Sequence, residues 1–172
     1  MRKTEFDRLM SPKPRERKTK SAAEALASLM RLCARGERAS GDARRLMATW
    51  GVPVEERDGV LQRLIADRFI DDRRYAEAYT REKSRLAGWG GRKIAAQLRT
   101  KGIAAAIIAD VLSSLDEDRQ AAHLAEKLRR KRATTKAATE YELRGKLLRY
   151  ALSLGYDYDM AIEAVDKLLR SE

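Results

Sequence analysis

The sequence predicts an all-α protein built as a tandem repeat of three three-helix units, elongated or curved in shape. Charged residues make up 37% of the 172 residues and aromatic residues only 6%, which is typical of amphipathic helices. Only three prolines are present. No segment alternates apolar and polar residues with the period of two that indicates a strand. Apolar residues instead recur at helical spacing along most of the chain.

Nine helical segments follow one another from Ser21 onward. Asp42 and the pair Asp71–Asp72 are candidate N-caps for the second and fourth segments, and glycines end several of the others. The apolar stripes that define the segments are, in chain order, Leu26–Leu29–Cys33, Ala43–Met47, Val60–Leu64, Tyr75–Tyr79–Leu86, Ile94–Leu98, Ile107–Leu115, Leu124–Leu128, Leu147–Ala151 and Ile162–Leu168.

A repeat becomes visible when the chain is aligned on Gly51, Gly102 and Gly155, which are 51 and 53 residues apart. Five positions around these glycines are apolar in every copy: Ala43/Ile94/Leu147, Met47/Leu98/Ala151, Val60/Val111/Ala164, Leu61/Leu112/Val165 and Leu64/Leu115/Leu168. Three short helices bury little surface, so neighbouring units complete each core. We expect a left-handed conformation at the shared glycine, which lets the chain turn tightly.

The expected organisation is a basic mobile tail at residues 1–20, followed by repeats at residues 21–70, 71–115 and 116–172. The tail holds eight Lys or Arg residues against three acids and has no apolar stripe. Such a segment contacts an anionic partner without fixed geometry. Cys33 is the one cysteine of the chain, and its helical spacing to Leu29 and Met30 predicts a core thiol.

A catalytic function is poorly supported by the sequence. His123 is the one histidine, and a lone histidine is more often structural or solvated than a general base. We find no phosphate-binding glycine loop, no metal-ligand spacing and no apolar run long enough for a membrane span. We therefore expect no catalytic residues, no metal, no cofactor, no membrane association and a cytoplasmic monomer.

The basic residues are better organised. The formal net charge is +11, which favours polyanionic partners. Residues 71–101 hold nine basic and four acidic side chains, and helical spacing places the basic ones away from the apolar stripes. The predicted partner- or polyanion-binding residues are Arg74, Arg81, Arg85, Arg92, Lys93, Arg99 and Lys101. The alternative is a solvated charged face, which is common on helices. A second basic block covers residues 127–132.

Two stretches resemble the RecX family. The first runs from Leu64 to Tyr79, where a helix end leads through a paired acidic turn into a helix rich in aromatic residues and alanine. The second runs from Gly90 to Ile103 and ends in Lys-Gly-Ile. The segment from Gly155 to Met160 is similar to the family's C-terminal repeat. The resemblance covers about residues 22–170 and is most specific in the middle repeat.

The resemblance implies tandem three-helix units and a regulatory role. Members of the family bind within the groove of the RecA–DNA filament and inhibit strand exchange, ATP turnover and repressor cleavage, without a cofactor. This chain departs from the pattern at Trp50, where the middle repeat has the basic Lys101. The runner-up is a direct DNA-binding protein with helix-turn-helix-like units. An enzyme such as a nuclease would need an acidic metal-binding cluster.

Overall fold

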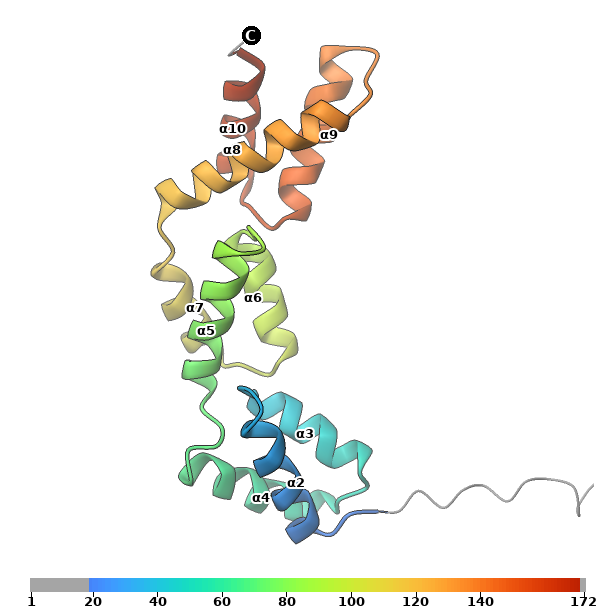
Figure 1. The fold of residues 1–172 in the computed structure, drawn as a ribbon, viewed down its shortest axis with the longest axis vertical. Coiled ribbons are helices and arrows are strands. Elements are labelled where there is room, and N and C mark those ends of the chain that lie inside the picture. The colour runs from blue at the N-terminus through green and yellow to red at the C-terminus, as the bar shows by residue number, and fades with distance from the viewer. Residues whose placement is uncertain (1–18, 171–172) are drawn as a thin grey trace, which may run out of the picture.

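A computed structural model describes residues 19–170, and this part of the chain contains nine α-helices and no strands. The helices form three groups of three, which follow one another along the long axis of the molecule (Figure 1). The all-α, elongated repeat expected from the sequence is therefore confirmed. The tail expected at residues 1–20 lies outside the described residues except for Thr19 and Lys20.

The first group consists of α2 (Ala22–Cys33), α3 (Ser40–Thr49) and α4 (Val54–Ala66). A capping box starts α2, because the Ser21 hydroxyl accepts from the Glu24 N–H and the Glu24 carboxylate accepts from the Ser21 N–H. Helices α2 and α3 pack on α4. The buried residues of this core are Ala25, Leu29, Ala43, Met47, Val52, Val60, Leu61, Leu64 and Ile70, with Cys33 half-buried at its edge.

The second group consists of α5 (Asp72–Arg85), α6 (Gly91–Thr100) and α7 (Ala105–Ser113), all in mutual contact. Its core includes Ala76, Ile94, Ala95, Leu98, Ile103, Ile108 and Val111, with Tyr75 and Tyr79 packed against it. The prediction that Leu86 belongs to the buried apolar stripe of α5 is wrong, because Leu86 is 83% exposed. Leu86 is the C-cap of α5, and Ala76 and Thr80 take the buried face of the helix.

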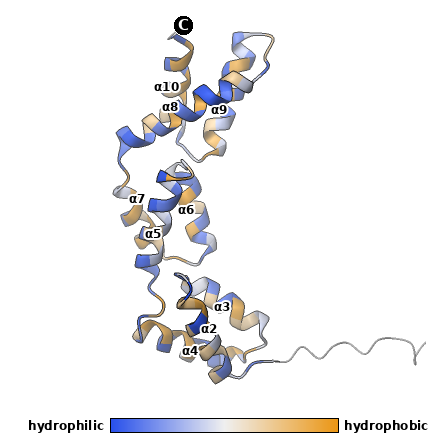
Figure 2. Ribbon diagram, viewed as in Figure 1, coloured by the Kyte–Doolittle hydropathy of each residue, from blue (hydrophilic) through white to orange (hydrophobic). Residues whose placement is uncertain are grey.

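The third group consists of α8 (Glu117–Thr134), α9 (Glu140–Ser153) and α10 (Tyr158–Arg170), again in mutual contact. Its buried residues are Leu124, Leu128, Leu147, Ala151, Tyr156, Ala161 and Val165. Hydrophilic residues dominate α5 and α8, whereas hydrophobic residues are more frequent on α7 and α10 (Figure 2). The two charged helices therefore present most of their surface to solvent.

The repeat positions on the middle helices are core positions. Two of the five triples are completely buried in every copy: Ala43/Ile94/Leu147 and Met47/Leu98/Ala151. The three shared glycines have φ values of 69°, 78° and 88°. The left-handed conformation expected at Gly51, Gly102 and Gly155 is therefore confirmed, and a residue with a β-carbon would adopt it only with strain.

The middle helices of the three repeats follow one another end to end. The C-terminal turn of α9 meets the N-terminus of α6, and the C-terminal turn of α6 meets the N-terminus of α3 (Figure 1). A β-carbon at Gly41 would lie 2.1 Å from the Lys101 carbonyl oxygen, and one at Gly90 would lie 2.4 Å from the Gly155 carbonyl oxygen. At each of these two junctions, which we call joints, the earlier repeat therefore needs a glycine where it receives the end of the middle helix of the following repeat.

Opposite helix dipoles meet at each joint. The carbonyl groups at a helix C-terminus carry partial negative charge, and the N–H groups at a helix N-terminus carry partial positive charge. Across the second joint, the Gly90 N–H donates to the Leu154 carbonyl at 2.9 Å and the Arg92 N–H donates to the Gly155 carbonyl at 3.0 Å. The end-to-end arrangement thus satisfies backbone groups that a free helix end would leave to water.

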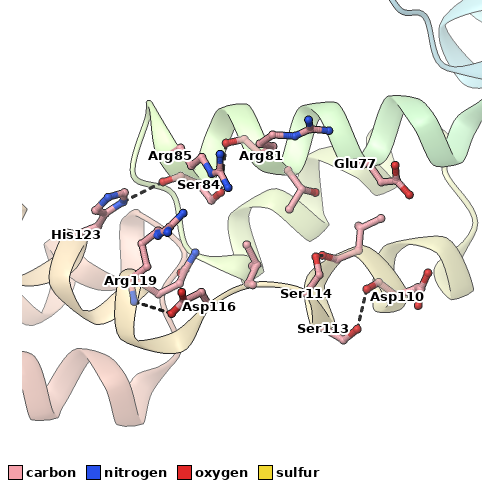
Figure 3. Close-up of a pocket in the computed structure, with 14 residues that line it drawn as sticks. Glu77, Arg81, Ser84, Arg85, Asp110, Ser113, Ser114, Asp116, Arg119 and His123 are labelled. Atoms are coloured by element: carbon pink, nitrogen blue, oxygen red, sulfur yellow. Dashed lines mark hydrogen bonds between the residues drawn. The ribbon is translucent and has the colours of Figure 1, made fainter.

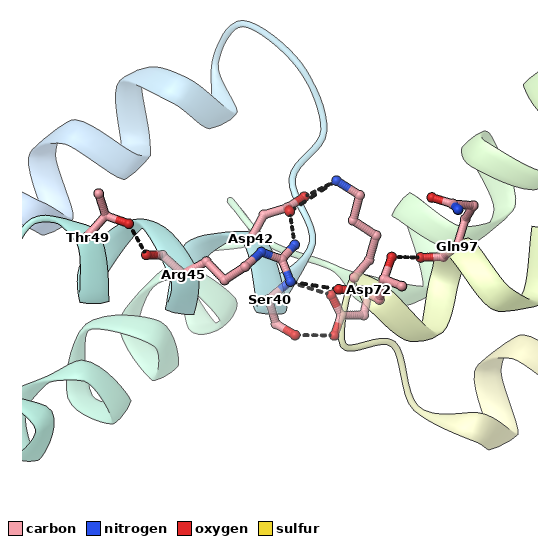
Figure 4. A network of polar contacts seen from close by, with 8 residues as sticks. Ser40, Asp42, Arg45, Thr49, Asp72 and Gln97 are labelled. Atoms are coloured by element: carbon pink, nitrogen blue, oxygen red, sulfur yellow. Dashed lines mark hydrogen bonds and ion pairs between the residues drawn. The ribbon is translucent and has the colours of Figure 1, made fainter.

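The first joint uses side chains for the same purpose (Figure 4). Helix α3 has no side-chain cap of its own; its N-cap is Ala39, not Asp42 as the sequence predicted. Instead Asp72 of the next repeat accepts from the Ser40 N–H at 2.8 Å and from the Ser40 hydroxyl at 2.6 Å. The two residues of the expected acidic pair therefore cap different helices. Asp71 caps α5 by accepting from the Arg74 N–H, and Asp72 caps α3 in the preceding repeat.

Residues just before α2 cover the C-terminus of α3 in the way that a preceding repeat would. The Lys20 N–H donates to the Trp50 carbonyl at 2.9 Å, and the Lys20 ammonium lies 3.7 Å from the centroid of the Trp50 ring. Lys20 was expected in the tail, but these contacts place it with the first repeat. It also brings a positive charge to the position where Trp50 replaces the lysine of the middle repeat.

Candidate anion-binding surface

Three of the seven predicted binding residues hold neighbouring repeats together. Lys101 forms an ion pair with Asp42 at 3.1 Å, and Arg74 forms one with Glu37 at 2.7 Å. The hydrogen bond to Glu37 raises the pKa of Arg74 above its already high usual value. These two side chains join the second repeat to the first, so their charges are already neutralised by acids of this chain.

Lys93 belongs to the second joint. Its backbone and β-carbon lie against Gly155, where an added β-carbon would be 2.2 Å from the Lys93 β-carbon and 2.4 Å from the Lys93 nitrogen. Its ammonium group donates to the Ser153 carbonyl at 3.4 Å and lies 4.5 Å from the centroid of the Trp89 ring. Lys83 approaches the same ring at 5.6 Å. Two lysines therefore flank a half-buried tryptophan at the junction of the second and third repeats.

The other four predicted residues, Arg81, Arg85, Arg92 and Arg99, are exposed. Within residues 19–170, none of their guanidinium groups has an ion-pair partner or a hydrogen bond. The structure does not bring all four to one place. Arg81 and Arg85 line one cavity, and Arg92 and Arg99 line another. The basic surface expected from the sequence is therefore divided between two hollows at the same junction of repeats.

The first hollow, which we call the α5–α8 cleft, has a volume of about 490 Å³. Helices α5, α7 and α8 form its walls (Figure 3). Its polar lining includes hydroxyl groups and charged side chains of both signs. Its residues are Glu77, Thr80, Arg81, Ser84, Arg85, Asp110, Val111, Ser113, Ser114, Leu115, Asp116, Arg119, Gln120 and His123.

The second hollow, which we call the α6–α10 groove, has a volume of about 560 Å³. Arg92 and Arg99 lie along it, and Tyr156 and Met160 of the third repeat contribute to its wall. Gln120 is 9% exposed and lines both hollows. The cleft and the groove therefore adjoin each other at Gln120.

Sequence spacing did not identify two basic side chains of the α5–α8 cleft. Arg119 lies on the first turn of α8, and His123 lies one turn later, with Nδ1 3.2 Å from the Ser84 carbonyl oxygen. The sequence led us to treat His123 as a lone structural or solvated residue. Because α8 belongs to the third repeat, only the packing of two repeats brings it to α5, and no pattern within one helix reveals this.

The second basic block closes α8, as expected. Its residues are Lys127, Arg129, Arg130, Lys131 and Arg132. Part of the block makes contacts within the chain: the Lys127 stem lies against Gly88, and the Lys131 ammonium lies 5.4 Å from the centroid of the Tyr150 ring. Arg130 pairs with Glu126. This block is therefore less free to meet a partner than the four exposed arginines of the second repeat.

The described part of the chain has no group of three His, Cys, Asp or Glu side chains placed to hold a metal ion. In the same part, no helix is both long enough and apolar enough to cross a bilayer. Burial raises the pKa of the Cys33 thiol, and a thiol shifted in this direction is a weaker nucleophile than a free one.

Comparison with known proteins finds likeness both in this region and along most of the chain. A family model described as "RecX, second three-helix domain" matches residues 71–112. A regulatory protein RecX of Clostridium perfringens is 39% identical over 106 residues, which cover 60% of this chain and 49% of that protein. One of Mycolicibacterium smegmatis is 28% identical over 170 residues, covering 96% of this chain and 87% of that protein.

Solved structures show the same fold. A crystal structure of regulatory protein RecX has a TM-score of 0.77 at 21% identity, covering 88% of this chain and 73% of that one. The crystal structure of RecX from Lactobacillus salivarius has a TM-score of 0.72 at 20% identity, with coverage of 87% and 97%. The match spans about half the length of the Clostridium relative, and 64% of the length of a Mycobacterium relative that is 30% identical.

Fold and surface together define an all-α tandem-repeat protein with arginine-lined hollows at a junction of repeats. The family model falls on the repeat that carries these arginines. In sequence and in fold the chain is similar to regulatory proteins of the RecX family.

Proposed function

We propose that this protein binds RecA–DNA filaments and inhibits the recombinase, and thereby regulates DNA repair and recombination. The affected activities would be strand exchange, ATP turnover and repressor cleavage, as the family resemblance implies. The protein would act by binding, as a cytoplasmic monomer, without catalysing a reaction and without a cofactor.

One observation carries this proposal. The family model matches the second repeat, and the second repeat presents four exposed arginines that have no acid partner among residues 19–170. An unpaired guanidinium group at the surface is available for a partner's carboxylate or phosphate. An elongated molecule with a formal net charge of +11 suits a long anionic groove better than a compact site.

The seven predicted residues would contribute in two ways. Arg81, Arg85, Arg92 and Arg99 would contact the filament directly, because nothing within the described chain neutralises them. Arg74, Lys93 and Lys101 would act indirectly, since they fix the orientation of the second repeat against its neighbours. Substitution of the first set would weaken binding, whereas substitution of the second set would loosen the joints between repeats.

A pull-down tests the proposal. The protein is immobilised and offered RecA assembled on single-stranded DNA, RecA alone, or DNA alone. Retention of the assembled filament above the other two samples supports the proposal, since only the filament presents protein and phosphates together. Equal retention of DNA with and without RecA would contradict it. That result would favour the second candidate, a protein that binds DNA directly, which the arginine-lined cleft also supports.

A further inference from the structure

The α5–α8 cleft contains polar groups that the contacts between repeats do not use. Thr80 lines it and is 4% exposed, yet its hydroxyl oxygen has no hydrogen-bond partner within the described residues. Buried polar side chains in proteins are nearly always hydrogen-bonded. The Thr80 hydroxyl is therefore a polar group beside the cleft that no contact within the described residues satisfies.

Arg85 and Arg119 lie at one end of the cleft, whereas Arg81 extends along α5 toward Glu77 (Figure 3). Arg85 and Arg119 extend from different helices toward the same space, with His123 beside them (Figure 3). Neither guanidinium group has an ion-pair partner in the described part of the chain. Asp116 also lies at this end, but its carboxylate caps α8 by accepting from the Arg119 N–H at 3.0 Å. The basic end therefore offers two unengaged guanidinium groups.

The histidine adds a polar group to this end. Its Nδ1 faces the Ser84 carbonyl oxygen, which can only accept a hydrogen bond. The hydrogen of the neutral ring therefore lies on Nδ1, and Nε2 is left for a ligand. His123 is half-buried and lines the cleft.

The opposite end of the cleft is acidic. Glu77 and Asp110 lie there, away from Arg85 and Arg119, with the Ser113 hydroxyl close to Asp110 (Figure 3). Asp110 also pairs with Arg73 outside the cleft. Carboxylates accept hydrogen bonds but cannot donate them. A ligand that spans the cleft therefore carries an anionic group at one end and hydrogen-bond donors at the other.

We propose that the α5–α8 cleft binds a nucleotide, with its phosphate between Arg85 and Arg119 and the donors of its base or sugar toward Glu77 and Asp110. Guanidinium groups bind phosphate oxygens through paired hydrogen bonds. The volume of about 490 Å³ lies in the range of roughly 300–1,000 Å³ that small-ligand sites occupy. The proposal deepens the proposed function, because it gives the nucleic-acid part of the filament its own contact.

The nucleotide could come from two sources, which share the phosphate chemistry. One is a unit of a single-stranded DNA, whose backbone would continue beyond the open cleft. The other is a free nucleotide such as ATP. Two binding measurements separate them: fluorescence anisotropy of a labelled single-stranded oligonucleotide, and the same measurement with a fluorescent ATP analogue. Both use the full chain without RecA, so they are independent of filament binding.

The test variant is Arg85→Ala/Arg119→Ala, and the matched control is Arg35→Ala/Arg129→Ala. All four residues are exposed and have no ion-pair partner in the described chain, so both variants lose the same charge and should stay folded, which circular dichroism checks. A third variant, Ser113→Trp, narrows the acidic end without changing the charge. Its side chain is exposed at the end of α7.

We expect the Arg85/Arg119 variant to bind one of the two probes at least about tenfold more weakly than the control variant does. If the probe is the oligonucleotide, the slope of log affinity against log salt should fall by about 0.7, the value for one phosphate contact on a single strand. Ser113→Trp should weaken the same probe. Equal losses in the cleft and control variants, for both probes, would overturn the proposal, because net charge alone would then explain binding.

Competition separates a nucleotide from a general anion. Poly-glutamate offers carboxylates without phosphates or bases. Displacement of the bound probe by poly-glutamate as readily as by unlabelled DNA or ATP would also overturn the proposal. The proposed function can fail separately. If the wild-type protein binds nucleotide at the cleft but neither binds nor inhibits RecA filaments, the proposed function is contradicted. The assignment of the cleft as a nucleotide site is then unaffected.

Discussion

Gly155 illustrates how much of this fold depends on single backbone positions. Its φ is +88°, and a β-carbon there would lie 2.2 Å from the Lys93 β-carbon and 2.4 Å from the Lys93 nitrogen. The residue therefore meets two constraints at once, a left-handed conformation and close approach of another repeat. Gly102 is less crowded, because the nearest atom to an added β-carbon would be the Gly41 α-carbon at 3.2 Å.

We predict that Gly155→Ala lowers the free energy of unfolding by more than about 2 kcal/mol, because the left-handed conformation alone costs about 1–2 kcal/mol. Gly59→Ala is the control. Gly59 lies within α4 with nothing near its missing β-carbon, so alanine there should raise stability by about 0.5–1 kcal/mol. Urea denaturation measures both. Equal effects of the two substitutions would show that the joint does not constrain Gly155.

We predict that ionisation of Tyr156 lowers the stability of the protein at high pH. It is 2% exposed, its hydroxyl donates to the Gly88 carbonyl at 3.2 Å, and burial raises its pKa to about 12. Because this pKa exceeds the ordinary value of 10.0, the folded state favours the neutral phenol. The contribution is complete below pH 10 and is lost as pH rises toward 12, by about 2–3 kcal/mol in total.

The measurement compares wild type with Tyr156→Phe in urea at about pH 9 and about pH 11.5. The wild type should lose more stability between these values than the variant does, because phenylalanine has no proton to release. Other tyrosines and the lysines titrate in both proteins, so the difference isolates Tyr156. Parallel losses in the two proteins would mean that Tyr156 ionises without penalty in the folded state.

At the scale of helices, the acidic pair at the start of α5 links two repeats. Asp71 caps its own helix, whereas Asp72 accepts two hydrogen bonds from Ser40 at the start of α3. The sequence alone indicated that either residue could cap the fourth helix. It did not indicate that a residue of the following repeat would cap α3, because a cap is recognised in a sequence by its position just before the helix.

We predict that Asp72→Ala lowers the free energy of unfolding by about 1–2 kcal/mol, as loss of an N-cap does. The substitution should also speed hydrogen exchange of the first-turn amides of α3, which lie in a different repeat from the substituted residue. Asp71→Ala, the matched control, should speed exchange at the start of α5 instead. Faster exchange confined to α5 in both variants would contradict the proposed cross-repeat cap.

The sequence predicted helices and core positions well because both depend on local periodicity. Ile94 and Leu98 are completely buried and Arg92 and Arg99 are exposed, as their helical spacing indicates. The same reasoning failed at Leu86, where α5 ends before the expected stripe does. It could not foresee the partners of Arg74 and Lys101, or the approach of Arg119 to Arg85, because these depend on how one repeat packs on the next.

At the scale of the whole molecule, the three middle helices form one end-to-end array. Lys20 covers the C-terminus of α3, which is the end of this array in the first repeat. We predict that removal of residues 1–18 leaves the unfolding transition unchanged and modestly weakens binding to DNA, because this basic segment has no apolar stripe to bury. Removal of residues 1–20 should in addition cost about 1–2 kcal/mol, through the lost hydrogen bond and cation–π contact with Trp50.

Thermal and urea denaturation of the two truncated proteins test this difference. The protein lacking residues 1–18 should match the full chain, and the protein lacking residues 1–20 should be less stable. Loss of cooperative unfolding in the shorter truncation would show that the basic segment is part of the core. Identical stabilities of both truncations would show that Lys20 does not secure the end of α3.

We propose that exposed arginines of the second repeat contact the recombinase filament. The most direct test is inhibition of DNA-dependent ATP turnover by Arg81→Glu/Arg92→Glu/Arg99→Glu, beside the matched control Arg35→Glu/Arg129→Glu/Arg149→Glu. All six arginines are exposed, so each substitution should change stability by no more than about 0.5 kcal/mol, and circular dichroism confirms folding. We predict that the first variant no longer inhibits, because reversed charges repel the filament, while the control inhibits nearly as well as wild type. Full inhibition by the folded first variant would contradict the claim.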